Sequence, residues 1–243
     1  MFRHRGKRRT FYHNLQLASL LSFVAGIVNV TSVLALNVFT TNITGHVAYF
    51  AEHVVEWRLN LALLFLVYSF CFLLGAFISN VLAEYFSRKN PRMAYTFPLL
   101  LEIALILWVI VVMSPTMQYG LEATAGILLF AMGVQNAMVT KISQSVVRTT
   151  HLTGIFTDLG IELSQLLFYK KVKSLRLLKR GIGLKATIVA SFFLGGILGG
   201  VGYPHWGINV LILAVAILLY AIGDDFLRYQ YYTIKRRWRY RRF

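Results

Sequence analysis

The sequence predicts an all-α membrane protein with about six transmembrane helices, arranged as two inverted three-helix repeats. Three observations predict this fold class: long apolar blocks, basic residues confined to alternate connections, and a hexapeptide that occurs twice. The 243 residues are 57% hydrophobic, yet the chain carries a formal net charge of +16. A soluble domain rarely combines the two, because it needs polar residues over its whole surface.

Six apolar blocks are predicted to cross the membrane, since a hydrocarbon core of about 30 Å needs roughly 20 helical residues. They cover residues 15–36, 59–83, 93–113, 121–140, 184–203 and 206–223. The chain then divides into four parts: a basic N-terminus (1–14), a first repeat (15–113), a second repeat (121–223) and a basic tail (224–243). The remaining connections are too short for a soluble catalytic domain, so we expect the function within the bilayer or at its faces.

Lys and Arg gather on one side of this predicted topology. With the N-terminus in the cytoplasm, 24 of the 25 basic residues lie on the inner side and only Arg58 lies outside. This positive-inside pattern predicts a cell (inner or plasma) membrane protein with both termini cytoplasmic. The basic termini are expected to contact anionic lipid headgroups, which are favoured over nucleic acid as their partner.

The two halves share sequence at three places in the same order. Residues 38–45 read Val-Phe-Thr-Thr-Asn-Ile-Thr-Gly and residues 147–154 read Val-Arg-Thr-Thr-His-Leu-Thr-Gly, with five of eight positions identical. Residues 26–29 parallel 133–136, and residues 71–76 parallel 191–196. Because each half has three crossings, an odd number, the second half enters the membrane from the opposite side. The sequence therefore predicts an inverted repeat.

The Thr-Gly elements are predicted to break the helix after the first span of each repeat. Thr44 and Thr153 are the predicted N-caps of short helices, with Gly45 and Gly154 allowing close backbone approach. A helix of 13 residues is about 20 Å long, too short to span. These helices either lie on the two membrane surfaces or dip inward as half-helices whose N-termini point at a central site. Their acidic polar faces favour the inward arrangement.

Polar residues inside the predicted spans are candidates for function, because intramembrane polar groups are costly. Asn29, Gln135 and Asn136 lie on the spans that precede the two helix breaks, and Glu102 lies within the third apolar block. Glu102 and Asp158 are the candidates for proton or ion coupling. Two simpler explanations stay open: the asparagines could serve as interhelical hydrogen-bonding groups, and Glu102 could be protonated or bonded to a neighbouring helix.

No local motif predicts catalysis. The sequence has no P-loop, no Gly-x-Ser-x-Gly and no Gly-x-Gly-x-x-Gly pattern. His46 and His53 share a helical face, but no third ligand has a fixed spacing from them. We therefore expect neither a catalytic residue nor a metal or other cofactor, and a protein that is not an enzyme.

The chain resembles the YoaK-like family of bacterial multi-pass membrane proteins of unknown function. The first signature reads Gly26-Ile27-Val28-Asn29 followed by Phe39 through His46, and the second reads Gly133 through Ala137 followed by Thr150 through Gly154. The resemblance covers roughly residues 14–225 and implies a membrane location and about six spans, but no substrate. The chain departs from the family pattern at Asn29, where Asp is more common, and at His46, where Asn is expected. These departures weaken any essential role for a carboxylate at position 29.

The leading functional hypothesis is a small secondary transporter or channel-like carrier for a small solute, since inverted repeats with broken helices place a site near the midplane. An anionic solute is favoured, because helix N-termini attract negative charge. The residues expected to bind the solute are Asn29, Thr44, Gly45, His46, Gln135, Asn136, Thr153 and Gly154. The alternatives are a non-transporting membrane scaffold or sensor and, less favoured, an intramembrane lipid-modifying enzyme that uses the histidines. A bundle this small is compatible with a homodimer.

Overall fold

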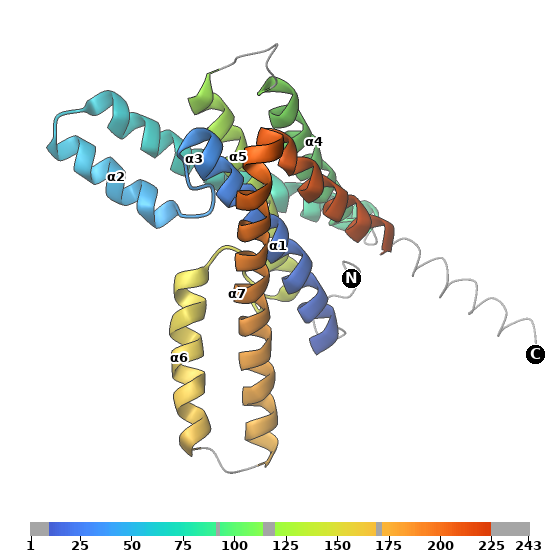
Figure 1. The fold of residues 1–243 in the computed structure, drawn as a ribbon. Coiled ribbons are helices and arrows are strands. Elements are labelled where there is room, and N and C mark those ends of the chain that lie inside the picture. Colours follow the sequence, from blue (N-terminus) through green and yellow to red (C-terminus); the bar gives the residue numbers. More distant parts are fainter. Residues whose placement is uncertain (1–9, 91–92, 114–119, 169–171, 225–243) are drawn as a thin grey trace, which may run out of the picture.

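The computed structural model of the chain describes residues 10–90, 93–113, 120–168 and 172–224, and all regular secondary structure within these ranges is helical. Long helices alternate with shorter ones along the chain (Figure 1). The elements are α1 (Phe11–Leu36), α2 (Ile43–Val55), α3 (Leu59–Lys89), α4 (Thr96–Val112), α5 (Leu121–Ser143), α6 (Leu152–Phe168), α7 (Val172–Trp206) and the short 3₁₀ helix η2 (Gly207–Val210). Residues 211–224 are again α-helical.

Four helical segments are long and apolar enough to cross a membrane: Phe11–Leu36, Leu59–Lys89, Leu121–Ser143 and the helical stretch Ser174–Asp224. The helix α4 is apolar but has only 17 residues. The stretch Ser174–Asp224 holds the last two predicted blocks, and the 3₁₀ turn of η2 lies at the start of the second of them. At this turn Gly207 has a φ of +54°, which an L side chain rarely adopts. The structure is therefore an all-helical fold with several apolar helices.

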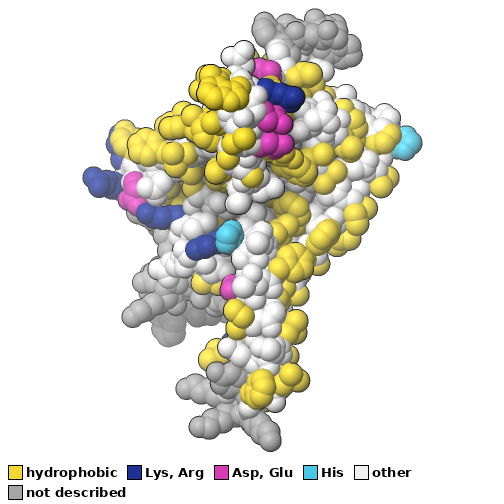
Figure 2. All heavy atoms as spheres, turned by 90° about the vertical axis from the view of Figure 1, so that its left-hand side faces the viewer, with side chains coloured by type: hydrophobic (Ala, Val, Ile, Leu, Met, Phe, Trp, Pro, Cys, Tyr) yellow, Lys and Arg dark blue, Asp and Glu magenta, His cyan; other side chains and the backbone are white. Residues whose placement is uncertain are grey.

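The surface of these helices is strongly hydrophobic. Large apolar side chains are exposed along α3, among them Leu63, Phe70 and Phe77, and along α7, among them Ile197 and Val201. Figure 2 shows one face of the molecule, where many patches of hydrophobic side chains are spread over the surface and charged side chains occur in small groups. Contact with lipid tails accounts for such a surface, because water would not stabilise so much exposed apolar area.

The helices α1 and α5 form the centre of the fold. In each, 67% of the most apolar 18-residue window is buried, compared with 17% for α3. Each central helix packs mainly against a long helix from the other half of the chain, α1 against α7 and α5 against α3. The short helices pack beside the long helices that follow them, so α2–α3 and α6–α7 form two hairpins (Figure 1). The two halves are thus interlocked.

Glycines allow the closest approach of α1 and α7. A Cβ added to Gly26 would overlap the backbone carbonyl of Phe192, and a Cβ added to Gly195 would overlap the backbone carbonyl of Phe23. Since backbone atoms of a packed helix cannot rotate away, these positions exclude any larger residue without separating the helices. Glycine is required here by the neighbouring helix.

The crossing of α3 and α5 is built in the same way. A Cβ on Gly133 would overlap the carbonyl of Phe72, and a Cβ on Gly75 would overlap the carbonyl of Phe130. These contacts correspond one to one with those between α1 and α7 when the shared sequences of the two halves are aligned. Parallel sequence has therefore produced parallel packing at two separate helix crossings.

Candidate functional site

The two Thr-Gly segments leave the central helices through similar turns, although the second turn has two extra residues, Ser145 and Val146, of which Ser145 is also left-handed with a φ of 63°. The helix α1 ends at Asn37 and α5 ends at Gln144, and both residues are left-handed with a φ of 55°. Residues 38–50 and 147–159 then have the same degree of burial at all thirteen aligned positions. In Figure 1, α2 and α6 both start near the centre of the molecule and run outward. The repeated sequence therefore folds into two similar turns, each followed by a short helix.

Asn29 pins the first of these turns to α1. Its side-chain Oδ1 accepts hydrogen bonds from the backbone N–H of Thr40 at 3.1 Å, the backbone N–H of Thr41 at 3.2 Å and the Thr41 hydroxyl at 2.9 Å. Thr40 is fully buried and Asn29 is 8% exposed. A buried carbonyl with several donors is well satisfied, so this contact holds the turn firmly in place.

The corresponding contact is missing in the second half. Asn136 aligns with Asn29, but its Oδ1 is shielded from solvent and has no hydrogen-bond partner among the described residues. Two other side chains of α5 hold the second turn: Gln135 Nε2 donates to the Thr149 hydroxyl at 3.3 Å, and Ser143 Oγ accepts from the backbone N–H of Val147 at 2.9 Å. The same Nε2 donates to the backbone carbonyl of Leu21 on α1 at 2.9 Å. Gln135 thus links the second turn to the first half, and Asn136 is left unsatisfied.

The predicted N-caps, Thr44 and Thr153, are wrong. The helix α2 begins at Ile43, and the cap is Asn42, whose Oδ1 accepts from the backbone N–H of Gly45 at 3.1 Å. The helix α6 begins at Leu152, so Thr153 lies inside its first turn. Both threonines have exposed side chains. Asparagine caps a helix as well as threonine does, and its longer side chain reaches the third amide of α2.

The two glycines leave room for the side chain three residues earlier. A Cβ on Gly45 would come within 2.6 Å of Asn42 Nδ2, and a Cβ on Gly154 would overlap the imidazole of His151. His151 aligns with Asn42, yet within the described ranges no side chain accepts a hydrogen bond from Gly154. Within the described part of the chain, α6 therefore begins without a side-chain cap, whereas Asn42 caps α2.

His46 anchors α2 against α3. It is 2% exposed, and its ring lies 5.7 Å from the rings of both Phe65 and Tyr68. Burial lowers the pKa of His46 below its ordinary value, so the neutral ring donates its Nε2 proton to the Phe39 carbonyl at 2.7 Å. Ile155 occupies the aligned position on α6 and is also buried. Because an apolar residue fills the same place in the second half, His46 is a packing residue first.

A cavity of about 260 Å³ lies where α6 starts beside α7. It brings together the predicted residues Gly154 and Asp158 with three basic residues that the sequence did not single out: Arg148, His151 and Lys185. The other lining residues are Ser145, Val146, Ile155 and Ile188. In Figure 2 a Lys or Arg side chain lies beside a histidine in one small surface group.

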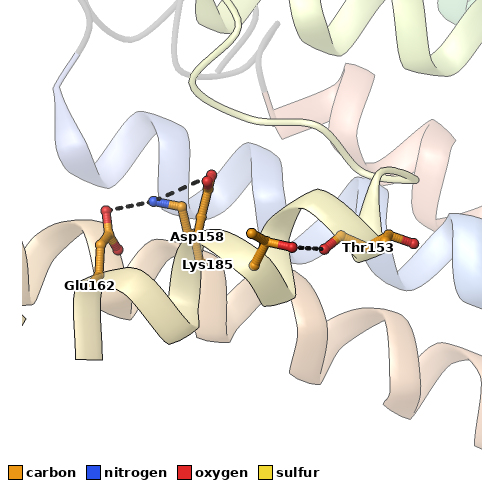
Figure 3. Close-up of polar contacts among 5 residues, drawn as sticks. Thr153, Asp158, Glu162 and Lys185 are labelled. Carbon is orange, nitrogen blue, oxygen red and sulfur yellow. Dashed lines mark hydrogen bonds and ion pairs between the residues drawn. The ribbon is translucent and has the colours of Figure 1, made fainter. Parts of the chain in front are cut away.

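Lys185 is held by two carboxylates of α6. Its Nζ lies 2.6 Å from Glu162 Oε1 and 3.9 Å from Asp158 Oδ2, as Figure 3 shows. Figure 3 also labels Thr153, whose carbonyl accepts the Thr157 hydroxyl at 3.1 Å. In contrast, no carboxylate in the described part of the chain pairs with Arg148. Arg148 and the N-terminus of α6 therefore supply the positive charge of the cavity that no direct ion pair takes up, while the Asp158 carboxylate lies in the same cavity and offsets part of it.

A second cavity, of about 560 Å³, adjoins the first. Its lining residues are Ala76, Asn80, Asn136, Ala137, Thr140, Lys141, Gln144 and Ser145. Ser145 lines both cavities. Asn136 therefore lines a hollow that shares the residue Ser145 with the cavity at the start of α6.

Glu102 is set apart from these residues. It lies on α4, is fully buried, and neither of its carboxyl oxygens has a hydrogen-bond partner within the ranges that the structure describes. It lines neither of the two cavities. The predicted site residues therefore form a first group around Asn29, Gly45 and His46, a second group around Asn136 and Gly154, and one isolated acid.

Comparison with known proteins confirms the predicted resemblance. A family model described as "Protein of unknown function (DUF1275)" matches residues 17–223. The chain is 28% identical over 211 residues to the UPF0700 transmembrane protein YoaK of Bacillus subtilis (strain 168), an alignment that covers 85% of this chain and 91% of that protein. No solved structure matches the chain. The transmembrane relative and the apolar helices together support a membrane location.

Proposed function

We propose that this chain, which belongs to the DUF1275 family of proteins of unknown function, is a small secondary transporter for a small organic anion. The observation that carries the proposal is the cavity at the start of α6. There the first turn of α6, which no side chain of the described residues caps, lines the same hollow as Arg148, and Arg148 pairs with no carboxylate of the described residues. Helix N-termini bind anions through free N–H groups and the positive end of the helix dipole.

The proposed architecture has six crossings in two inverted repeats, residues 15–113 and 121–223. The third crossings would be α4 and residues 211–224. Two kinds of observation support the repeat: the matching glycine contacts at the two helix crossings and the matching burial of the two Thr-Gly segments. In transporters of this design, discontinuous helices bring their ends to a site between the repeats. We place both termini in the cytoplasm of a cell membrane, on the charge distribution.

The chemistry of the cavity suits a carboxylate or a similar small anion. The backbone N–H groups of Leu152, Thr153 and Gly154 belong to the first turn of α6, where no carbonyl of the same helix is available to them. Arg148 offers a planar pair of donors that matches a carboxylate. Lys185 is already neutralised by Glu162, so it would shape the cavity more than bind the solute.

Two carboxyl groups are proposed for coupling. Asp158 lines the cavity and lies 3.9 Å from Lys185 Nζ, a weak contact that leaves it free to exchange a proton or a cation. Glu102 is fully buried on the apolar helix α4 and has no partner among the described residues, the setting in which membrane carboxyl groups act as proton carriers. Coupling through either group would make uptake depend on a proton or cation gradient.

The experiment that tests the proposal uses purified protein in liposomes. Thermal-shift screening with small carboxylates, phosphate and sulfate identifies a binding anion, and flux of that anion is then measured. Arg148→Gln should weaken binding by about tenfold or more, because a charge-assisted hydrogen bond contributes about 1.5–3 kcal/mol. Arg176→Gln is the matched control, since Arg176 is exposed on α7 and does not line the cavity.

The outcomes separate the alternatives. An anion that binds and moves across the bilayer, with both reduced only by Arg148→Gln, supports the transporter. If no small solute shifts the melting temperature or crosses the bilayer, the proposal fails, and co-purification of a partner protein would identify the scaffold or sensor. Turnover of a lipid extract by the purified protein would identify the lipid-modifying enzyme instead.

The basic termini are proposed to bind anionic lipid headgroups. They lie in residues 1–9 and 225–243, outside the described part of the chain. Binding to vesicles with and without phosphatidylglycerol is measured for the full-length protein and for a variant truncated at residue 228. This comparison tests the lipid contact independently of solute flux.

A further inference from the structure

The two halves differ sharply at one pair of aligned residues. Asn29 accepts hydrogen bonds from Thr40 and Thr41, while Asn136 Oδ1 accepts none from the residues that the structure describes. The aligned threonines of the second half, Thr149 and Thr150, offer the same donors in a turn with the same pattern of burial, which two extra residues, Ser145 and Val146, separate from the end of α5. The chemistry for a second set of bonds is therefore present, but in this conformation those bonds are not made.

We propose that Asn29 and Asn136 act as alternating latches on the two Thr-Gly turns. In the conformation seen here, the first latch is closed and the second is open. In a second conformation the roles exchange: Asn136 Oδ1 accepts from Thr149 and Thr150, and Asn29 releases Thr40 and Thr41. This inference rests on the proposed transport function, because exchange of conformations between inverted repeats is what turns the site from one side of a membrane to the other.

Three features of the second half fit the open state of a latch. The buried Oδ1 of Asn136 has no donor, which raises the free energy of the conformation seen here. Hydrogen bonds from Thr149 and Thr150 in the closed latch would remove this cost. Gln135 holds Thr149 through a single 3.3 Å bond, a weak contact that can be exchanged. The cavity that Asn136 lines gives the second turn room to move toward it.

The start of each short helix follows the same asymmetry. Where the latch is closed, Asn42 caps α2 by accepting from Gly45. Where the latch is open, α6 begins without a side-chain cap from the described residues and faces the proposed anion cavity. The open latch and the free helix end therefore occur together in one half. Closing the second latch would move this helix end relative to α7 and change access to the cavity.

Hydrogen–deuterium exchange of the full-length protein in lipid nanodiscs tests the latches without any solute. Asn29→Ala should speed exchange of the Thr40 and Thr41 amides by about tenfold or more, because both lose their acceptor. If the latches alternate, the same variant should also slow exchange at Thr149 and Thr150, as Asn136 closes on them. If Asn29 only holds its own turn, Asn29→Ala should speed exchange at Thr40 and Thr41 without slowing it at Thr149 and Thr150.

Asn136→Ala gives the complementary result. It should leave exchange at residues 40–41 unchanged and, when combined with Asn29→Ala, should abolish the slowing at residues 149–150. Asn80→Ala is the matched control, because Asn80 lines the same cavity but has no aligned latch. Thr41→Val, which removes only the 2.9 Å hydroxyl bond, replaces Asn29→Ala if that variant fails to fold.

The results distinguish the latch from transport. Reciprocal exchange without flux of any solute would support the latches and overturn the transporter. Flux together with exchange that changes only at the mutated half would support transport and overturn the latches. Slowing at residues 149–150 in Asn80→Ala as well would also overturn them, since the effect would then not depend on the paired asparagines.

Discussion

Replacing Gly133 with alanine should force α3 and α5 apart and destabilise the fold. The added Cβ would overlap the backbone carbonyl of Phe72 and lie 3.1 Å from the backbone nitrogen of Ala76. Since neither atom belongs to a flexible side chain, the helices themselves must move. Overpacking of this kind costs about 1–3 kcal/mol, and a rigid backbone neighbour places the cost at the upper end.

Alanine is also a better helix former than glycine, by about 1 kcal/mol in a helix interior. Subtracting this gain leaves a net loss of about 2 kcal/mol for Gly133→Ala. Gly160→Ala is the matched control, because Gly160 lies within α6 and a Cβ added there would have no described atom within 4 Å. There only the helix-propensity gain remains, so the two variants should differ by about 3 kcal/mol in the free energy of unfolding.

Unfolding in mixed micelles, followed by tryptophan fluorescence, measures this difference. Gly26→Ala supplies an internal check, because it meets the carbonyl of Phe192 just as Gly133→Ala meets that of Phe72. The two crossing variants should lose similar stability. Should Gly133→Ala unfold at the same denaturant concentration as Gly160→Ala, the close crossing of α3 and α5 would be refuted.

Four other predictions concern individual residues of the two halves. Gly45→Ala should cost only about 1 kcal/mol, since the Asn42 cap can swing away, and measured unfolding near wild type with intact flux would agree. Glu102→Gln should fold normally but make uptake insensitive to a pH gradient; retained sensitivity would exclude it as a proton carrier. Lys185→Met should lower stability by about 1–2 kcal/mol at low salt and less at high salt, because half-buried ion pairs are only partly screened. Since burial lowers the pKa of His46, stability should fall as pH drops below the unfolded value of about 6.5, and His46→Phe should flatten that slope.

Much of the fold could be predicted because the bilayer imposes strong length and charge rules. The long apolar blocks became α1, α3, α5 and α7, and the short helix after the first span was found in each half. The 13-residue estimate is right for α2, but α6 has 17 residues.

The capping residue could not be chosen from sequence, for a physical reason. The segment Thr40-Thr41-Asn42-Ile43-Thr44 offers four side chains that can cap a helix. Asn29, which lies on α1, accepts hydrogen bonds from the first two threonines. These threonines are therefore not available as caps, and Asn42 caps α2. That choice depends on a tertiary contact over more than ten residues. Local capping preferences alone therefore cannot predict which residue caps the helix.

The basic residues of the cavity were not predicted, because identity between the two halves does not reveal them. Arg148 and His151 occupy the two repeat positions where the copies differ most, opposite Phe39 and Asn42. Lys185 lies in a lysine-rich stretch that is typical of an ordinary cytoplasmic connection. The sequence did contain a signal for these residues, because two basic residues of the second copy replace uncharged residues of the first. That signal lies in the positions where the two copies differ.

Identical and different positions of the repeat serve different purposes. Of the identical positions, the buried Thr40 and Thr149 hold the turns, and Gly45 and Gly154 make room for the preceding side chain. All of these are structural tasks, which both copies must perform for the chain to fold. A ligand, in contrast, meets one copy at a time in an asymmetric conformation. Chemistry specific to a solute should therefore be sought at the positions where the copies differ, and Arg148 is the first of these to test.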